Sequence, residues 1–156
     1  MENKIKTWEE IERISKELRN KKILVTTCGT FDLLHPGHIF SMEEAKKQGD
    51  VLIICLNSDA SVKTYKSPER PIENQEIRAK KISLLGCVDY VVIFEETTPL
   101  KLLNLIKPHK HVKSKSGFKG VETETIKLNG GEIILIEDVP GYSTTKIIEE
   151  KGINSS

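Results

Sequence analysis

ILVTTCGTFDLLHPGH, residues 23–38, begins as an apolar run and ends as a turn that carries two histidines. The run from Ile23 to Thr27 is typical of a short buried strand, and the residues from Ile39 to Gln48 are helix-like. The turn therefore lies between the end of a strand and the start of a helix. The unpaired N–H groups and partial positive charge of a helix N-terminus favour binding of an anion such as phosphate.

The two histidines of this turn, His35 and His38, are three residues apart. Pro36 suits the first helical turn, where no N–H donor is needed, and Gly37 allows the backbone to come close to a ligand. We expect both imidazoles to lie on one side of the helix and to donate to the same phosphate. An isolated HxxH pattern has an alternative interpretation, which is a strand-to-helix turn with two surface histidines.

The segment GTFDLLHPGH (29–38) resembles the signature of the nucleotidyltransferase superfamily that is marked by HxGH. Members of that superfamily transfer a nucleotidyl group from ATP or CTP to a phosphate, and this form of the motif is similar to the cytidylyltransferase-like branch. Four further segments resemble the adenylyltransferase that makes ADP-heptose from heptose 1-phosphate. They are NSDASVK (57–63), ERPI (69–72), VDYVVIFEE (88–96) and GYSTT (141–145).

The bulk properties predict one soluble globular domain over residues 1–156, with a leading amphipathic helix within residues 1–20. The net charge of +1 argues against a general nucleic-acid or membrane surface. No apolar run approaches the length that spans a membrane. The three cysteines are widely spaced and form no CxxC motif, which favours neither a zinc site nor a disulfide framework and predicts a cytoplasmic protein.

Apolar runs alternate with helical patterns along the chain, which predicts an α/β fold. The runs are apolar throughout, as in a Rossmann-like parallel sheet with helices on both faces. The expected strands cover residues 23–27, 50–56, 88–94, 109–113 and 132–136, and the expected helices cover 8–18, 39–48, 74–85, 98–107 and 144–150. Loops 29–38, 57–73 and 113–120 and the GYSTT segment then gather at the carboxyl edge of the sheet, where ligands bind in such folds.

The resemblance implies a role for each of these loops. His35 and His38 contact the triphosphate, and Lys63 joins them among the catalytic residues. The implied nucleotide-binding residues are Gly29, Thr30, Phe31, Gly37, Lys113, Ser143, Thr144 and Thr145. The implied substrate-binding residues are Asp32, Arg70 and Arg78. Asp32 is also expected to support the turn, and the alternative role at its position is to help place Mg²⁺.

The sequence contains neither a Walker A motif nor a Rossmann GxGxxG, so histidines, lysines, arginines and helix N-termini must hold the phosphates. This set suits attack by a substrate phosphate oxygen on the α-phosphate of a nucleoside triphosphate, with pyrophosphate leaving in line. The attacking phosphate is already ionised, so catalysis depends on placement and charge neutralisation. Because no dense carboxylate cluster is visible, we expect Mg²⁺ to be held mainly by the phosphates and not by protein side chains alone.

Three departures from the nearest branches leave the choice of ATP or CTP, and the identity of the acceptor, open. CGTFD (28–32) looks like the glycerol-3-phosphate cytidylyltransferases, whereas heptose enzymes usually carry Asn-Gly-Cys-Phe-Asp. Asp138 stands where those cytidylyltransferases carry an arginine, and a carboxylate facing the site opposes triphosphate binding. VKSKSGF (112–118) replaces the Val-Lys-Gly-Gly-Asp of the heptose enzymes, so the role of the loop around Lys113 and Lys115 is also open.

The first hypothesis is an adenylyltransferase that acts on D-glycero-D-manno-heptose 1-phosphate or a related sugar phosphate. Its partners are then a nucleoside triphosphate and a small phosphorylated acceptor, without nucleic acid or membrane. The alternatives are a glycerol-3-phosphate cytidylyltransferase, an archaeal-type FAD synthetase, and a catalytically silent nucleotide-binding module. The resemblance also implies a homodimer.

Overall fold

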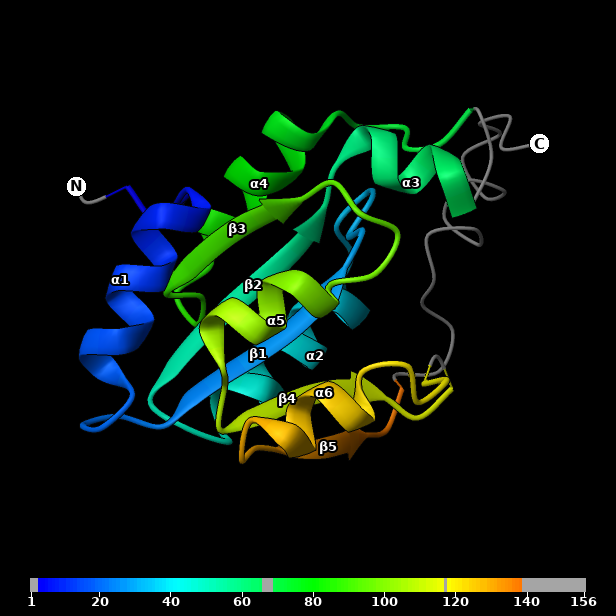
Figure 1. The fold of residues 1–156 in the computed structure, drawn as a ribbon. Coiled ribbons are helices and arrows are strands. Elements are labelled where there is room, and N and C mark those ends of the chain that lie inside the picture. The colour runs from blue at the N-terminus through cyan, green and yellow to red at the C-terminus, as the bar shows by residue number, and fades with distance from the viewer. Residues whose placement is uncertain (1–2, 66–68, 117, 139–156) are drawn as a thin grey trace.

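A computed structural model describes residues 3–65, 69–116 and 118–138, which form a five-stranded sheet with helices on both faces (Figure 1). All strand pairs are parallel, and the order across the sheet is β3-β2-β1-β4-β5. The strands are β1 (Leu24–Gly29), β2 (Val51–Asn57), β3 (Tyr90–Phe94), β4 (Lys110–Ser114) and β5 (Glu132–Ile136).

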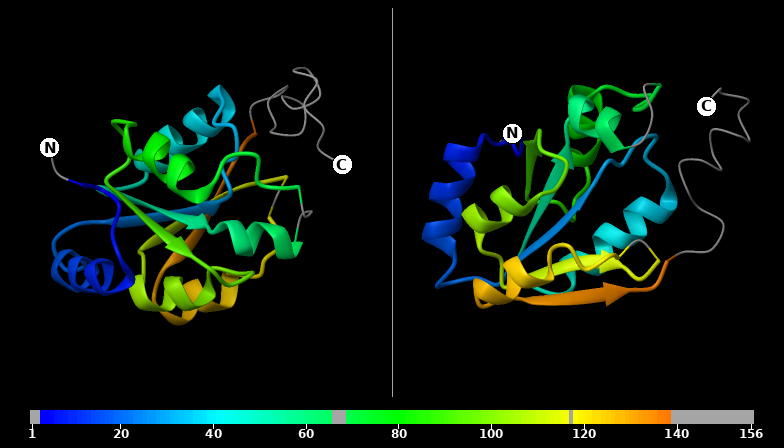
Figure 2. Two further views of the ribbon diagram at one scale, coloured as in Figure 1. Left: turned by 90° about the horizontal axis from the view of Figure 1, so that it is seen from above. Right: turned by 45° about the vertical axis from the view of Figure 1, so that its right-hand side comes forward.

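Helices cover the two faces of the sheet unequally, and the views of Figure 2 show this arrangement from two further sides. The helices are α1 (Trp8–Leu18), α2 (Pro36–Lys46), α3 (Asp59–Tyr65), α4 (Gln75–Ser83), α5 (Leu100–Ile106) and α6 (Thr123–Leu128). Buried side chains of α1, α5 and α6 pack on one face, and those of α2 and α4 pack on the other. Within the described residues, no helix combines the length and apolar character needed to cross a bilayer.

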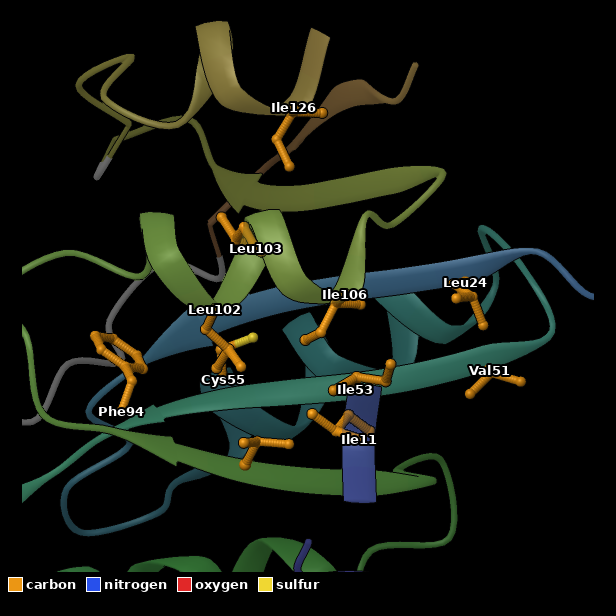
Figure 3. Packing of buried hydrophobic residues seen from close by; sticks show 11 residues of the cluster. Ile11, Leu24, Val51, Ile53, Cys55, Phe94, Leu102, Leu103, Ile106 and Ile126 are labelled. Atoms are coloured by element: carbon orange, nitrogen blue, oxygen red, sulfur yellow. The ribbon is translucent and has the colours of Figure 1, made fainter. Parts of the chain in front are cut away.

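The central strand β2 shows why the sheet needs cover on both faces. All seven of its residues are buried, and alternate side chains enter opposite core clusters. Ile53 and Cys55 lie in the cluster that contains Leu102 of α5 and Ile11 of α1 (Figure 3). Leu52, Ile54 and Leu56 lie in the cluster built with α2 and α4.

The α/β fold and all five predicted strands are confirmed, and no strand boundary differs by more than two residues. The leading helix is also confirmed, and it begins with a capping box. Glu10 N donates to Thr7 Oγ1 at 3.1 Å, and Thr7 N donates to Glu10 Oε1 at 2.9 Å. The helix expected at residues 144–150 lies outside the described residues.

Two helices were not predicted. The seven-residue α3 occupies part of the expected loop 57–73, and the six-residue α6 follows the expected loop 113–120. Both are too short to show a helical period, and their stability comes from tertiary contacts. In α3 the Ser61 hydroxyl donates to the Glu96 carbonyl at 2.6 Å, and Asp59 N donates to Gln75 Oε1 at 2.9 Å. In α6 the one buried residue is Ile126.

The strand order reverses between β1 and β4. From β1 the chain adds β2 and β3 on one side, and it then crosses over to add β4 and β5 on the other. The crossover connections leave from opposite sides of this point, so a crevice opens at the carboxyl ends of β1 and β4. The loops that the sequence singled out, 29–38 and 113–120, follow these two strands.

Candidate functional site

The turn between β1 and α2 is closed by its two histidines. His35 is the N-cap residue of α2, and its Nδ1 accepts from the backbone N–H groups of Gly37, at 3.1 Å, and His38, at 3.3 Å. In return His38 Nδ1 accepts from the His35 N–H at 3.3 Å. This arrangement is a capping box in which imidazoles replace the usual hydroxyl and carboxylate.

The capping contacts decide the proton positions on both rings. Because each Nδ1 accepts a hydrogen bond, the proton of each neutral imidazole lies on Nε2, which makes Nε2 a donor. The rings of His35 and His38 stack with centroids 3.6 Å apart. Burial lowers the pKa of His35 below its ordinary value of 6.5, so its ring is neutral near pH 7. The turn therefore presents paired donors at a helix N-terminus.

Gly29 and Phe31 shape the backbone before these histidines. Phe31 has φ +50°, in the left-handed region, and its ring meets His38 edge-on with centroids 5.3 Å apart. A Cβ on Gly29 would lie 3.0 Å from the Phe31 ring, so glycine leaves room for that ring at the end of β1. The two residues act together on the position of His38.

Asp32 ties this turn to the segment that precedes α4. Its carboxylate is buried and accepts from the N–H groups of Ile72, at 2.7 Å, and Glu73, at 2.9 Å. It also accepts from Arg70 Nε at 3.2 Å, in an ion pair buried on both sides. These contacts agree with the structural role expected for Asp32. They also engage Arg70 in an ion pair with Asp32.

Arg78 is a charged residue of the site whose side chain is fully buried. It donates to the carbonyls of Thr30, at 2.8 Å, and Asn57, at 2.9 Å, and so joins the ends of β1 and β2. It also pairs with Asp59 at 2.8 Å and donates to the Glu73 carbonyl at 2.9 Å. The placement of Arg78 favours support of the loops over direct contact with a substrate.

A cavity of about 240 Å³ opens at the carboxyl ends of the strands. Gly29 and Lys113 are the predicted site residues that line it. His35 and His38 lie on the neighbouring turn and do not line it, and Lys63 is exposed in the last turn of α3. The other lining residues are Cys28, Asn57, Phe94, Thr97, Thr98, Pro99, Lys119, Val121 and Glu122.

One wall of the cavity is a polar cluster that the sequence analysis did not find. Lys113 Nζ donates to Cys28 Sγ at 3.4 Å and lies 3.9 Å from Glu122 Oε1. The Cys28 thiol lies 3.8 Å from the same carboxylate and 4.0 Å from Nε2 of the buried His111. Burial raises the pKa of Cys28, against the effect of Lys113, and lowers the pKa of His111 to about 3.

The cluster was missed because its members are far apart in the chain: Cys28 is 83 residues from His111 and 94 from Glu122. The wide spacing of the cysteines, without a CxxC motif, also favoured no zinc site in the sequence. The available signal was positional, since Cys28 and His111 both lie in strands that end at the crevice.

The loop after β4 meets the end of the described chain. Ser116 N donates to Asp138 Oδ2 at 3.2 Å, and hydrogen bonds from Ser116 lower the pKa of this carboxyl. Lys115 pairs with Glu137. Asp138 therefore keeps its negative charge close to the Lys113–Ser116 segment. Ser143, Thr144 and Thr145 lie outside the described residues.

Known proteins resemble this chain over most of its length. "Bifunctional protein HldE" of Aliarcobacter butzleri is 48% identical over 146 residues, which cover 93% of this chain and 30% of that protein. The protein of the same name from Nitratiruptor is 49% identical over 93% of this chain and 31% of its own length. The chain thus spans less than a third of these curated relatives.

Solved structures share the fold. A lipopolysaccharide core biosynthesis protein from Thermoplasma volcanium superposes with a TM-score of 0.67 at 29% identity, covering 76% of this chain and 98% of that one. Pantoate-beta-alanine ligase from Francisella tularensis reaches a TM-score of 0.52 at 15% identity, covering 94% of this chain and 76% of its own, which indicates the fold alone. The family profile described as cytidylyltransferase-like matches residues 26–150. The chain therefore belongs to the cytidylyltransferase-like family of nucleotidyltransferases.

Proposed function

We propose that this chain transfers an adenylyl group from ATP to a sugar phosphate of the heptose 1-phosphate type and releases pyrophosphate. The observation that carries the proposal is the pair of stacked imidazoles, His35 and His38, whose Nδ1 atoms cap α2 and whose Nε2 atoms are therefore donors. The choice of substrates rests on the segments that resemble the adenylyltransferase that makes ADP-heptose, and on the likeness to the HldE proteins over 93% of the chain.

The reaction depends more on hydrogen-bond donors to the phosphates than on a general base. A phosphate oxygen of the acceptor attacks the α-phosphate, the bond to the β-phosphate oxygen breaks, and negative charge builds on the transferred group and on the leaving pyrophosphate. His35 and His38 donate to the triphosphate from Nε2 as this charge grows, and the N-terminus of α2 adds its dipole. Loss of one such donor typically lowers the rate about 100- to 1000-fold.

Asp32 and two arginines stabilise the geometry of the histidine turn. Asp32 and Arg70 connect the turn to residues 72 and 73, and Arg78 joins the ends of β1 and β2. We assign these three residues to positioning of the HxGH turn. Their enclosed contacts favour this role over the direct substrate binding that the resemblance implied.

Mg²⁺ would enter as part of the ATP complex. Among the described residues, the only group of three or more metal-ligating side chains is Cys28, His111 and Glu122. A thiol and an imidazole do not suit Mg²⁺, which prefers oxygen ligands and keeps several waters. The protein donors therefore do not fit a resident Mg²⁺, and the triphosphate oxygens would hold the ion.

The remaining roles are predictions. Lys63 lies exposed at the end of α3, from where a long side chain can reach toward a bound phosphate. Lys113 lines the cavity and can contact the nucleotide there. The roles of Ser143, Thr144 and Thr145 and the homodimer follow from the resemblance, and the cytoplasmic location follows from the wide spacing of the cysteines.

Pyrophosphate release tests the proposal. Purified protein is incubated with Mg²⁺, ATP or CTP, and a panel that contains heptose 1-phosphates, glycerol 3-phosphate and FMN. We expect turnover with ATP and a heptose phosphate. Turnover only with CTP and glycerol 3-phosphate, or only with ATP and FMN, would favour the corresponding alternative, and no turnover with any pair would favour the silent module.

Variants of two histidines link activity to the turn. His38→Ala should lower turnover about 100- to 1000-fold while the protein stays folded. His109→Asn is the matched control, because His109 Nδ1 accepts from Leu24 N at the opposite edge of the sheet and asparagine keeps an acceptor there. Full activity of His38→Ala would contradict the assigned role.

A further inference from the structure

Three side chains of different ligand chemistry meet at the wall of the cavity. Cys28 comes from β1, His111 from β4, and Glu122 is the residue that precedes α6. Their sulfur, nitrogen and oxygen atoms all lie within 4.8 Å of one another. We propose that Cys28, His111 and Glu122 form a binding site for a transition-metal ion of the Zn²⁺ class, which is separate from the Mg²⁺ that accompanies ATP.

The spacing of the donor atoms is close to that of a tetrahedral site. Zn²⁺ binds sulfur at about 2.3 Å and nitrogen or oxygen at about 2.0–2.2 Å, which places neighbouring ligand atoms roughly 3.5 Å apart. Cys28 Sγ lies 4.0 Å from His111 Nε2 and 3.8 Å from Glu122 Oε1. Side-chain movements of about half an ångström would bring these two pairs to bonding distance of one ion.

The surroundings of His111 also suit a ligand. The side chain is fully buried, and its Nδ1 lies 2.7 Å from the hydroxyl of Thr26. A metal-binding histidine usually donates its second N–H to such a partner, which fixes the ring and its tautomer. Thr26 can accept this bond and leave the Nε2 lone pair directed at the cluster.

The cavity supplies access and a fourth position. Cys28 and Glu122 line it, whereas His111 lies behind them. A metal ion held by three protein ligands would therefore face the cavity with one open coordination position, the arrangement found in catalytic zinc sites. The sulfur and nitrogen donors would select Zn²⁺ or a similar ion against Mg²⁺.

Lys113 places a positive charge where the ion would lie. Its Nζ is 3.4 Å from Cys28 Sγ and 3.9 Å from Glu122 Oε1. The ammonium and the metal ion compete for the same two ligands, so metal binding requires Lys113 to turn away into the cavity that it lines. Replacement of this lysine by an uncharged residue should tighten metal binding, whereas a purely structural lysine would have no such effect.

Cobalt absorption provides a readout that is independent of activity. The metal-free full chain is titrated with Co²⁺, and the thiolate-to-cobalt charge-transfer band is followed and then reversed with Zn²⁺. Wild type should show the band at one ion per chain, and Cys28→Ser should lose it. Cys87→Ser is the matched control, because Cys87 is a partly buried cysteine outside the cluster.

Two more variants complete the test. Lys113→Met should bind more tightly than wild type, and Thr26→Val should bind about 10- to 100-fold more weakly, as is usual for loss of a partner that orients a ligand. Thermal unfolding checks that each variant is folded. If Cys28→Ser is not, Glu122→Gln replaces it: this variant keeps the thiolate but loses a carboxylate ligand, so it should bind Co²⁺ more weakly, and an unchanged affinity would overturn the proposal. The proposal is overturned by a missing band in wild type, even if Lys113→Met shows one, or by an unchanged band in Cys28→Ser.

Discussion

Replacement of His35 separates the two roles that the structure gives to this residue. Its Nδ1 accepts from the N–H groups of Gly37 and His38, and its Nε2 is the donor assigned to phosphate. Asparagine is one of the best N-cap residues, so His35→Asn keeps an acceptor for the helix and removes the distant donor. His35→Ala removes both. Both variants lose the stacked contact with the His38 ring, so the difference in stability between them measures the contribution of the N-cap.

The two variants should lose activity to the same extent but differ in stability. Both variants should lose about 100- to 1000-fold in kcat, or about 2.7–4 kcal/mol of transition-state stabilisation, because one phosphate donor is absent. Only His35→Ala should lose the cap, which costs about 1 kcal/mol. For a chain of 156 residues this corresponds to a Tm about 2–4 °C below that of His35→Asn.

Two measurements suffice: steady-state pyrophosphate release with ATP and the acceptor identified by the panel, and thermal unfolding without ligand. Turnover of His35→Asn at the wild-type rate would refute the assignment of Nε2 as a phosphate donor. Equal unfolding temperatures for the alanine and asparagine variants would refute the capping role of Nδ1. His109→Asn should match wild type in the activity assay.

Three further predictions follow from other contacts. Arg78→Met should lower the free energy of unfolding, measured by urea titration, by about 3–5 kcal/mol, because it leaves the carbonyls of Thr30 and Asn57 and the Asp59 carboxylate without this donor. Lys81→Met on the same helix removes an exposed pair worth about 0–1 kcal/mol. Equal losses would contradict the supporting role of Arg78. Gly29→Ala places a Cβ 3.0 Å from the Phe31 ring and should cost about 1–3 kcal/mol with reduced turnover, while Gly86→Ala, where nothing lies within 4 Å, should be neutral in both assays. Burial lowers the pKa of His35 below 6.5, so the unfolded state binds more protons and the free energy of unfolding should fall as the pH drops through 6.5. Urea titrations at several pH values should show a smaller fall for His35→Asn than for wild type. An equal fall in both proteins would show that His35 is not its source.

The strands and the position of the histidine turn between a strand and a helix were accessible from the sequence, because each depends on local pattern. Glu132–Ile136 is an apolar run between turn residues, and its predicted bounds match β5. The HxGH turn was expected between a strand and a helix, and His35 does cap α2. Parallel strands share one carboxyl edge, so the gathering of the loops at that edge followed from the predicted parallel sheet.

Side-chain partners depended on the tertiary structure. Arg70 and Arg78 were expected to bind substrate, since arginine matches phosphate, but packing encloses both against Asp32 and loop carbonyls. The short helices α3 and α6 are stabilised by hydrogen bonds and packing with neighbouring elements. Such contacts leave no helical period in the local sequence.

The difference between the features that the sequence predicted and those that needed the tertiary structure has a physical cause. Hydrophobic period and capping chemistry act over a few residues, so the chain by itself determined the strands, the α/β class and the histidine turn at the start of a helix. The proximity of Cys28, His111 and Glu122, with Lys113 beside them, arises only when β1 pairs with β4, whose partner residues are 85 positions apart in the sequence. Contacts of that range depend on which strands become neighbours, and only the folded sheet decides this.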